Sequence, residues 1–311
     1  MLNCCILIFY FLGAETNEDK SYIYISGGKN DEKTYENCVL KMDTNMGRWN
    51  HFKTMGARRS EHQSLLKGDQ LYFIGGHNGS GYVESAKNEI VSLSDELAAK
   101  TFPFMHNKRL SFGMCSLAEC VFVGGGYQNP SEALDKCEVY SFETREWTEV
   151  SSMNTKRSEC TLTYFQGKIW AIGGFNDVDK WLDTIETFDI TQNRWTTSNL
   201  RLLTERAGHG TVAYDKKLFV VGGGYEESIF SSVEVYSSET NQFSFVASMN
   251  IPRCNFGCCV VNSSLYAMGG SSLDYDAPTD EVEMYDVEEN KWRRGPSLPL
   301  KLADFACSET L

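Results

Sequence analysis

The sequence has little of what most enzymes use for catalysis or metal binding. It holds only five histidines, scattered along 311 residues without an HxH or HExxH pair. Its eleven cysteines include no CxxC pair, so a zinc site has no support. It also lacks a GxSxG elbow, a phosphate-binding GxxxxGK(S/T) loop and a GxGxxG that opens a helix. These absences make an enzyme the least favoured class, and they predict neither a metal nor a cofactor.

Positive charge is also in deficit. The chain has 29 lysines and arginines against 42 aspartates and glutamates, a formal net charge of −13, and no basic block. Nucleic acid and anionic membrane surfaces are therefore not expected as main partners. A basic peptide, or a basic patch on another protein, better complements the negative electrostatic field of this chain. Acidity alone also commonly serves solubility, so both interpretations stay open.

Regular cysteine spacing is absent as well. The number of cysteines is odd, and several of them lie inside strand-like runs. This pattern favours buried thiols in a reducing compartment over a disulfide framework, and it predicts a cytoplasmic protein. A redox-sensing thiol is a further possibility. Cys254 is its best candidate, because the neighbouring Arg253 would favour the thiolate.

The N-terminal segment, residues 1–20, favours a different compartment. Met1–Ala14 is an apolar stretch of signal-peptide length that is too short to span a bilayer as a helix. It has no lysine or arginine near its start, so a leftover of a longer parent or an extra strand are competing interpretations. If the segment is a signal peptide, the protein is secreted.

Glycine doublets recur six times at nearly constant spacing. Their first members are Gly27, Gly75, Gly124, Gly173, Gly222 and Gly269, at steps of 48, 49, 49, 49 and 47 residues. Two doublets are triplets, which leaves their register open by one residue. Each doublet ends an apolar, β-favouring run such as Lys168–Ile172. Two glycines there fit a bulge or a close backbone crossing.

Two further positions recur in the repeats beside the doublets, and we call the set of residues at each such position a column. One places a large aromatic seven residues after a Met, Tyr or Phe, at Met42 with Trp49, Tyr140 with Trp147, Phe188 with Trp195, Tyr236 with Phe243, and Tyr285 with Trp292. In the weak second copy, Ser92 and Ala99 fill these positions. The other column is arginine, 15 or 16 residues ahead of the next doublet, at Arg59, Arg109, Arg157, Arg206 and Arg253. We expect the aromatic residues to be buried anchors between neighbouring units.

A unit of this length accommodates four short strands with their turns, because strands average about 5–6 residues. The di-glycine repeat with its Tyr-x6-Trp column resembles the kelch repeat from about residue 21 to residue 311. The resemblance implies an all-β, six-bladed β-propeller. The first doublet has no strand just before its own strand. We therefore expect the C-terminal tail, Ala303–Leu311, to close the first blade and remove the open edges.

The resemblance is strongest to the kelch domain of BTB–kelch adaptors of cullin ubiquitin ligases. Those receptors bind peptides through the residue after the arginine and the aromatic after the doublet. Adding the aromatics of acidic loops gives the candidate partner-binding residues Arg59, Ser60, His77, Tyr127, Ser158, Phe175, Trp181, Tyr225, Cys254 and Tyr275. We interpret Arg109, Arg206 and Arg253 as buried groups that bond strand-end carbonyls. Arg59, between Arg58 and Ser60, is expected to be a surface contact.

The loops beside these aromatics carry carboxylates, among them Asp177, Asp179, Asp183, Glu226, Glu227, Asp274, Asp276 and Asp280. They suit a peptide with lysine or arginine, although the acidity of the whole chain explains them equally well. We thus predict a non-catalytic, monomeric protein-binding propeller. It has no preceding BTB segment, so direct cullin binding is not expected. The alternatives are a secreted kelch binder and an actin-associated or scaffold protein that uses Arg48, Arg293 and Arg294.

Overall fold

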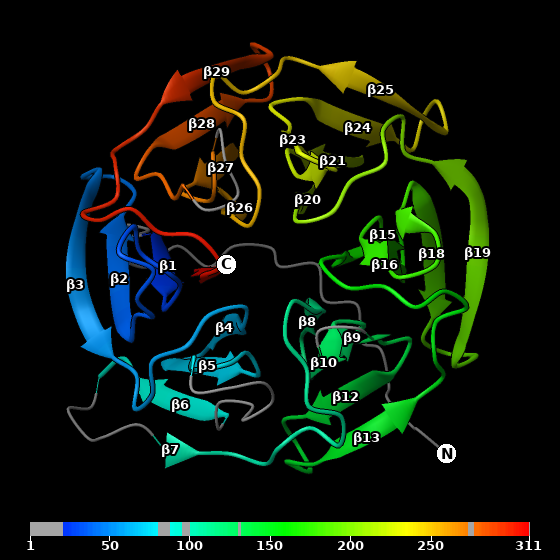
Figure 1. The fold of residues 1–311 in the computed structure, drawn as a ribbon, viewed down its shortest axis with the longest axis horizontal. Helices are drawn as coiled ribbons and strands as arrows, with labels where there is room; N and C mark the ends of the chain where they lie inside the picture. Colours follow the sequence, from blue (N-terminus) through cyan, green and yellow to red (C-terminus); the bar gives the residue numbers. More distant parts are fainter. Residues whose placement is uncertain (1–20, 80–87, 95–99, 130–131, 273–276, 311) are drawn as a thin grey trace, which may run out of the picture.

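A computed structural model describes residues 21–79, 88–94, 100–129, 132–272 and 277–310. Within these ranges every regular element is a β-strand, so the predicted all-β class is confirmed. Six four-stranded antiparallel sheets surround a common centre as the blades of a propeller (Figure 1). No helix in the described ranges is long and apolar enough to cross a membrane. The proposed signal or extra strand in residues 1–20 lies outside them.

Each blade runs from an inner strand near the centre to an outer strand at the rim. Blade 1 has β30 (Ala306–Glu309), β1 (Tyr22–Ser26), β2 (Cys38–Asp43) and β3 (Arg48–Thr54). Blade 2 has β4 (Gln63–Lys67), β5 (Gln70–Ile74), β6 (Glu89–Ser92) and β7 (Lys100–Thr101). Blade 3 has β8 (Gly113–Leu117), β9 (Cys120–Gly124), β12 (Cys137–Ser141) and β13 (Trp147–Val150).

The remaining blades follow the same order. Blade 4 has β14 (Thr161–Phe165), β15 (Lys168–Ile172), β18 (Thr184–Asp189) and β19 (Arg194–Arg201). Blade 5 has β20 (Gly210–Tyr214), β21 (Lys217–Val221), β24 (Val233–Ser237) and β25 (Gln242–Val246). Blade 6 has β26 (Gly257–Val261), β27 (Ser264–Met268), β28 (Val282–Asp286) and β29 (Lys291–Arg294).

The C-terminal strand closes the first blade, as the sequence predicts. In β30, Cys307 pairs with Ile25 of β1 in an antiparallel register. Figure 1 shows the red end of the chain beside the blue first strand. The inner strand β30 also contacts β26 of the last blade and β4 of the second. The two ends of the repeat array are thus joined within one sheet.

The aromatic column forms the core between blades. Tyr140 and Trp147 are 4% and 6% exposed, and their ring centroids lie 5.2 Å apart. The second copy is aligned differently from our expectation. Val91 faces Leu71 in the register where Tyr140 faces Val121, so Val91 takes the tyrosine position and Ser92 does not. Ala99 lies outside the described residues. Alternation along the strand places Ser92 on the opposite face of the sheet.

The doublets mark close backbone crossings. Gly174 has a φ of +101°, and a Cβ there would lie 2.5 Å from the carbonyl oxygen of Ser158. The two triplets resolve in opposite ways. Positive φ falls on Gly125 and Gly126 in the first but on Gly222 and Gly223 in the second. The residue after the doublet is therefore Tyr127 in blade 3 but Gly224 in blade 5, which corrects the placement of Tyr225 in that position.

The arginine column is buried and paired with a glutamate column that our sequence reading missed. In blade 4 the Arg157 guanidinium donates to the Gly173 carbonyl at 2.8 Å and to the Glu186 carboxylate at 2.9 Å. The same arrangement joins Arg109 with Glu138, Arg206 with Glu234, Arg253 with Glu283, and Arg59 with Glu89. The structural interpretation of Arg109, Arg206 and Arg253 is confirmed.

The structure corrects the expectation that Arg59 is a surface contact. Its side chain is 0% exposed, so it is not a surface contact. Blade 2 needs the same internal bond between the arginine and the strand end as the other blades, because a buried strand-end carbonyl requires a donor. The exposed arginine at this point is Arg58, which donates to the carbonyl of Tyr35 at 2.6 Å.

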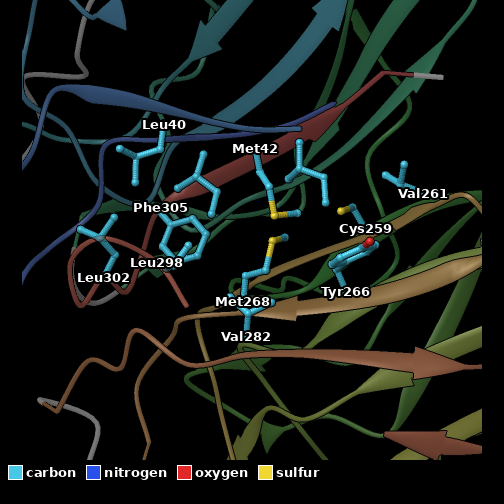
Figure 2. Close-up of a cluster of buried hydrophobic side chains, with 12 residues drawn as sticks. Leu40, Met42, Cys259, Val261, Tyr266, Met268, Val282, Leu298, Leu302 and Phe305 are labelled. Carbon is cyan, nitrogen blue, oxygen red and sulfur yellow. The ribbon is translucent and has the colours of Figure 1, made fainter. Parts of the chain in front are cut away.

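Blade 1 lacks this ion pair and replaces both of its members. Leu302 stands at the arginine position, and Leu40, two residues before Met42, stands at the glutamate position. Both leucines are buried in one apolar cluster with Phe305 and Leu298 (Figure 2). Replacing both partners leaves no unpaired buried charge, whereas replacing one would.

Candidate functional site

The residues after the arginine and after the doublet meet at one end of every blade. In blades 2, 3 and 4 the bridged pairs are Ser60 with His77, Leu110 with Tyr127, and Ser158 with Phe175. In blades 5, 6 and 1 they are Ala207 with Gly224, Cys254 with Ser271, and Ala303 with Lys29. The prediction that two loops per unit share one face is confirmed. We call this end of the ring the loop face.

Three predicted contacts lie beneath the loop face. Ser60, Ser158 and Cys254 are 0%, 0% and 1% exposed. The Ser158 hydroxyl donates to the Phe175 carbonyl at 3.1 Å and also hydrogen-bonds Tyr127. The Ser60 hydroxyl lies 3.3 Å from His77 Nε2. Because they are buried, these side chains cannot contact a partner directly in this conformation. The two serines instead hydrogen-bond neighbouring residues of the loop face.

Cys254 also differs from its predicted chemistry. Burial, followed by the charges of Asp304 and Glu159, raises the pKa of its thiol rather than lowering it. The neighbouring Arg253 does not help, because its guanidinium points to the Gly269 carbonyl and to Glu283. The prediction of a reactive thiolate at Cys254 is therefore wrong.

A band of partly exposed aromatic side chains crosses blades 3 to 5. The Phe175 and Trp181 ring centroids lie 5.3 Å apart, and those of Trp181 and Tyr225 lie 5.1 Å apart. Tyr127 borders the band through its bond to Ser158, and burial raises the pKa of its phenol to about 12. We call Tyr127, Phe175, Trp181 and Tyr225 the aromatic band. Ring contacts join three of these predicted site residues, and Tyr127 is linked to them through Ser158.

Small hairpins that follow the doublets hold the aromatic band. They are β10 (Tyr127–Asn129) with β11 (Glu132–Ala133), β16 (Phe175–Asn176) with β17 (Lys180–Trp181), and β22 (Gly224–Tyr225) with β23 (Ser228–Ile229). In blade 4 the buried Asn176 side chain accepts hydrogen bonds from the backbone N–H groups of Val178 and Asp179. It donates to the carbonyl of Lys156 at 3.1 Å. This Asx turn places Trp181 opposite Phe175.

Carboxylates surround the aromatic band. Asp177, Asp179, Glu226 and Glu227 are exposed. Asp183 is engaged elsewhere, in a 2.8 Å ion pair with Arg201. The charge of Glu226 raises the pKa of Tyr225. Tyr275, a predicted contact, and the nearby Asp274 and Asp276 lie outside the described residues.

His77 belongs to a second group on blades 1 and 2. Its ring lies 5.0 Å from that of Tyr35, and its Nε2 lies 3.1 Å from the Glu61 carboxylate. Lys29 lies 5.8 Å from the Tyr35 ring centroid. His77 is therefore not part of the aromatic band, and Cys254, which pairs with Ser271 in blade 6, belongs to neither group.

A closed hydrogen-bonded ring surrounds the mouth of the central channel. Its six members stand two residues after the arginine position, and each donates its backbone N–H to the carbonyl of the member in the preceding blade, at 2.7–3.1 Å. Every member has a positive φ of 50–62°. We call them the mouth ring: Glu61, Ser111, Glu159, Gly208, Asn255 and Asp304.

Three acids of the mouth ring face one small cavity of about 120 Å³. Burial, together with the Glu61 charge, raises the pKa of Glu159 to about 7. The same causes raise the pKa of Asp304 to about 7. Burial opposes ionisation of Glu61 too, but hydrogen bonds from His77 and Ser111 hold its pKa below the usual value. The mouth thus carries one carboxylate and two acids that ionise near neutrality.

Our sequence reading missed the mouth ring. The signal was available, because the position two after each arginine is a short polar residue, an acid or glycine in all six copies. Asn and Asp adopt positive φ more readily than most residues, and glycine does so without cost.

Two family models match the chain. The KLHDC2/KLHL20/DRC7 Kelch-repeats domain matches residues 99–270, and the Kelch motif matches residues 252–299. Kelch-like protein 36 of Mus musculus is 26% identical over 290 residues, covering 89% of this chain and 47% of the relative. Kelch-like protein 23 of Homo sapiens is 31% identical over 194 residues, covering 60% of this chain and 32% of the relative.

A third relative, Kelch repeat and BTB domain-containing protein 8 of Homo sapiens, is 29% identical over 201 residues, covering 61% of this chain and 31% of the relative. The chain spans about half the length, or less, of these curated relatives. The solved structure titled "Structure of YjhT" superposes with a TM-score of 0.68 at 14% identity, over 82% of this chain and 88% of that one. This likeness bears on the fold alone.

Proposed function

The chain belongs to the kelch-repeat family of β-propellers, and from this premise we propose that it is a non-catalytic module that binds a protein segment on the aromatic band. The observation that carries the proposal is the trio of Phe175, Trp181 and Tyr225, whose rings contact one another edge-to-face or tilted and which two blades hold in place. Partly exposed aromatic clusters of this kind are typical anchors in protein recognition. The sequence contains no catalytic motif that would favour an enzyme.

We propose further that the bound segment carries lysine or arginine. A cation over an aromatic face is attracted by the ring quadrupole, at about 0.5–2 kcal/mol. Asp177, Asp179, Glu226 and Glu227 surround the band and would favour the same charge. The net charge of −13 adds a long-range attraction for basic ligands.

The test is binding to fluorescent peptides that differ only in charge. Wild-type protein should prefer peptides with two or three arginines over the same sequences with glutamate. Trp181→Ala combined with Tyr225→Ala should weaken that binding at least about tenfold, since two aromatic rings of the proposed surface are lost. Phe245→Ala is the matched control, because Phe245 is an aromatic that is 57% exposed on the outer strand β25.

Two results would contradict the proposal. One is a preference for the acidic peptides. The other is an equal loss of binding in Phe245→Ala and in the double variant, because binding would then not depend on the loop face.

We propose that this recognition serves a role like that of the substrate-binding half of kelch adaptors of ubiquitin ligases, with no direct cullin contact by this propeller. A monomer in a reducing compartment, and hence a cytoplasmic location, belongs to the same proposal. All nine cysteines in the described ranges are free thiols, which suits such a compartment.

The actin or scaffold alternative uses the rim of the propeller. Arg293 and Arg294 are 61% and 71% exposed, but each has an acidic partner in its own blade, Asp286 and Glu281. These intramolecular pairs would have to be broken before a partner could bind. The aromatic band is therefore the better supported surface. Co-sedimentation with actin filaments that the Trp181 and Tyr225 changes leave intact would favour the rim instead.

A further inference from the structure

Two thiols and one carboxylate meet at the seam where the first and last blades join. Cys259 lies on β26 of blade 6, and Cys307 and Glu309 lie on β30 of blade 1. Their sulfur and oxygen atoms all lie within 4.8 Å of one another. Cys259 and Cys307 are 48 residues apart in the sequence, so no CxxC-type spacing marks the group. Only closure of the ring brings it together.

The group has no cationic partner in the described part of the chain. No ion pair is found there for the Glu309 carboxylate. A hydrogen bond with Cys307, together with burial, raises the pKa of the Cys259 thiol. Burial raises the pKa of Glu309 to about 7. The two sulfur atoms and the carboxylate therefore converge on one point where a bound cation could contact all three.

We propose that Cys259, Cys307 and Glu309 bind a thiophilic divalent cation of the Zn²⁺ class. Two sulfur ligands and one carboxylate oxygen match the ligand preference of Zn²⁺, and Mg²⁺ or Ca²⁺ would favour an all-oxygen set. Zn²⁺ binds the thiolate forms, so the protons of the two thiols are released to the solvent on binding. No oxidant or reductant is involved.

The central channel gives the ion a route to this site. Cys307 and Glu309 line a channel cavity of about 300 Å³ to which the inner strands of all six blades contribute. Water from the channel is available to complete a four-coordinate shell around three protein ligands. Cys259 contributes from the buried side of the seam, where it is 2% exposed.

The site links metal binding to ring closure. One ligand comes from the last blade and two come from the strand that completes the first blade. Any ion that binds the closed ring and not the open chain stabilises closure by mass action. The ion would cross-link β26 and β30. This site is separate from the loop face that the proposed partner uses.

The test uses the full chain, stripped of metal under a thiol-free reductant, and Zn²⁺ in competition with a chromophoric chelator. Wild-type protein should bind one Zn²⁺ per chain, and its Tm should rise with Zn²⁺. Cys307→Ser and Glu309→Gln should each weaken binding at least about tenfold, because each removes one ligand. Cys120→Ser, which removes a thiol from β9 of blade 3, should bind as tightly as wild type.

The pH dependence adds a second readout. Zn²⁺ affinity should fall as the pH is lowered from 8 to 6, since the ligands must release protons. Glu309→Gln keeps the size of the side chain, so it serves if Cys307→Ser does not fold.

Three results would overturn the proposal. One is unchanged Zn²⁺ affinity in Glu309→Gln, and another is an equal loss in Cys120→Ser, which would indicate adventitious binding to thiols. The third is a Cys259–Cys307 disulfide, found by peptide mapping in the reductant-treated protein.

Discussion

At the scale of single residues, five buried arginine–glutamate pairs each stabilise one blade, while blade 1 holds two leucines in the same place. The Glu186 carboxylate also accepts the backbone N–H groups of Asn154 and Thr155. We expect Glu186→Leu or Arg157→Leu alone to cost about 3–5 kcal/mol of unfolding free energy, because each leaves a buried charge unpaired.

The double variant should cost clearly less than the sum of the two single variants, since blade 1 tolerates the same double change. Urea unfolding of the three variants gives the double-mutant cycle. Strict additivity would show that the ion pair contributes no coupling and that each group acts through its backbone bonds alone.

A second prediction concerns Glu159 in the mouth ring. Its pKa, raised to about 7 in the folded protein, exceeds the ordinary value of 4.5 expected after unfolding. The folded state therefore binds the extra proton between about pH 4.5 and 7, and unfolding free energy from this group is lost as the pH rises through that window.

Glu159→Gln should be more stable than wild type by about 1–2 kcal/mol at pH 8, and the gain should vanish by pH 4.5. The buried His62 and His209, whose pKa values are lowered by burial, titrate in the opposite sense, but they are common to both proteins and cancel. Chemical unfolding at several pH values measures the difference. A constant difference across that range would mean that Glu159 does not titrate there.

The arginine column could be predicted to be buried, but its glutamate partners could not. Each glutamate stands two residues before the aromatic position, on a strand where a lone carboxylate is normally assigned to the solvent face. Only the neighbouring blade connection, which supplies the two N–H groups, makes its burial favourable. Arg59 was misjudged for a related reason, because its partner Glu89 belongs to the weakest copy of the repeat.

At the scale of elements, β30 supplies the inner strand of the first blade from the far end of the chain. A chain ending at Asp304 should leave β1 as an open edge and uncover the Leu40 cluster. We expect its Tm to fall by at least about 10 °C, since several kcal/mol of buried contacts are lost.

A synthetic peptide of residues 303–311, added in trans, should restore part of that loss. Differential scanning calorimetry compares the three samples. If the truncated chain melts like wild type, β30 is not essential for closure.

The hairpin that carries Trp181 gives a second prediction at this scale. Asn176→Ala removes two hydrogen bonds that form the turn between β16 and β17. The tryptophan should then lose its fixed position, and affinity for an arginine-rich peptide should fall about three- to tenfold through the ordering entropy. Val178→Ala, a change at a side chain in the same turn that is 85% exposed, is the matched control, and fluorescence anisotropy gives the affinities. An unchanged affinity in Asn176→Ala would show that the turn does not organise the site.

The strands were predictable because their apolar runs, glycine doublets and aromatic columns repeat. The register of the triplets was not, because three consecutive glycines fit either alignment equally well. The prediction therefore placed Tyr127 correctly in the position after the doublet, whereas Tyr225 lies one residue beyond that position. Tyr225 still reaches the aromatic band through its contact with Trp181.

At the scale of the whole molecule, the net charge of −13 sets the strength of the long-range attraction for a basic partner, and the salt concentration sets its range. The association rate of a basic peptide should fall about tenfold or more between 0.02 M and 0.3 M salt, as screening shortens the Debye length. The dissociation rate should change little, because the aromatic contacts are short-range. Stopped-flow measurements separate the two rates, and a salt-independent association rate would remove long-range attraction from the proposed mechanism.

The blade count and the closure of the ring could be predicted, because both follow from the number of repeats and from one missing strand. The mouth ring and the Cys259–Cys307–Glu309 group could not. Their members come from different blades, and proximity across blades depends on the curvature of the closed propeller, which no single repeat encodes.

The mouth ring also constrains how the family repeat can evolve here. Its six peptide groups follow one another head to tail without a beginning or an end, and each requires a neighbour at one fixed angular step. A chain that gained or lost a blade would change that step for every member at once. The geometry of the six hydrogen bonds therefore matches a propeller of six blades. Insertion or deletion of a repeat would disrupt these bonds at the channel mouth first.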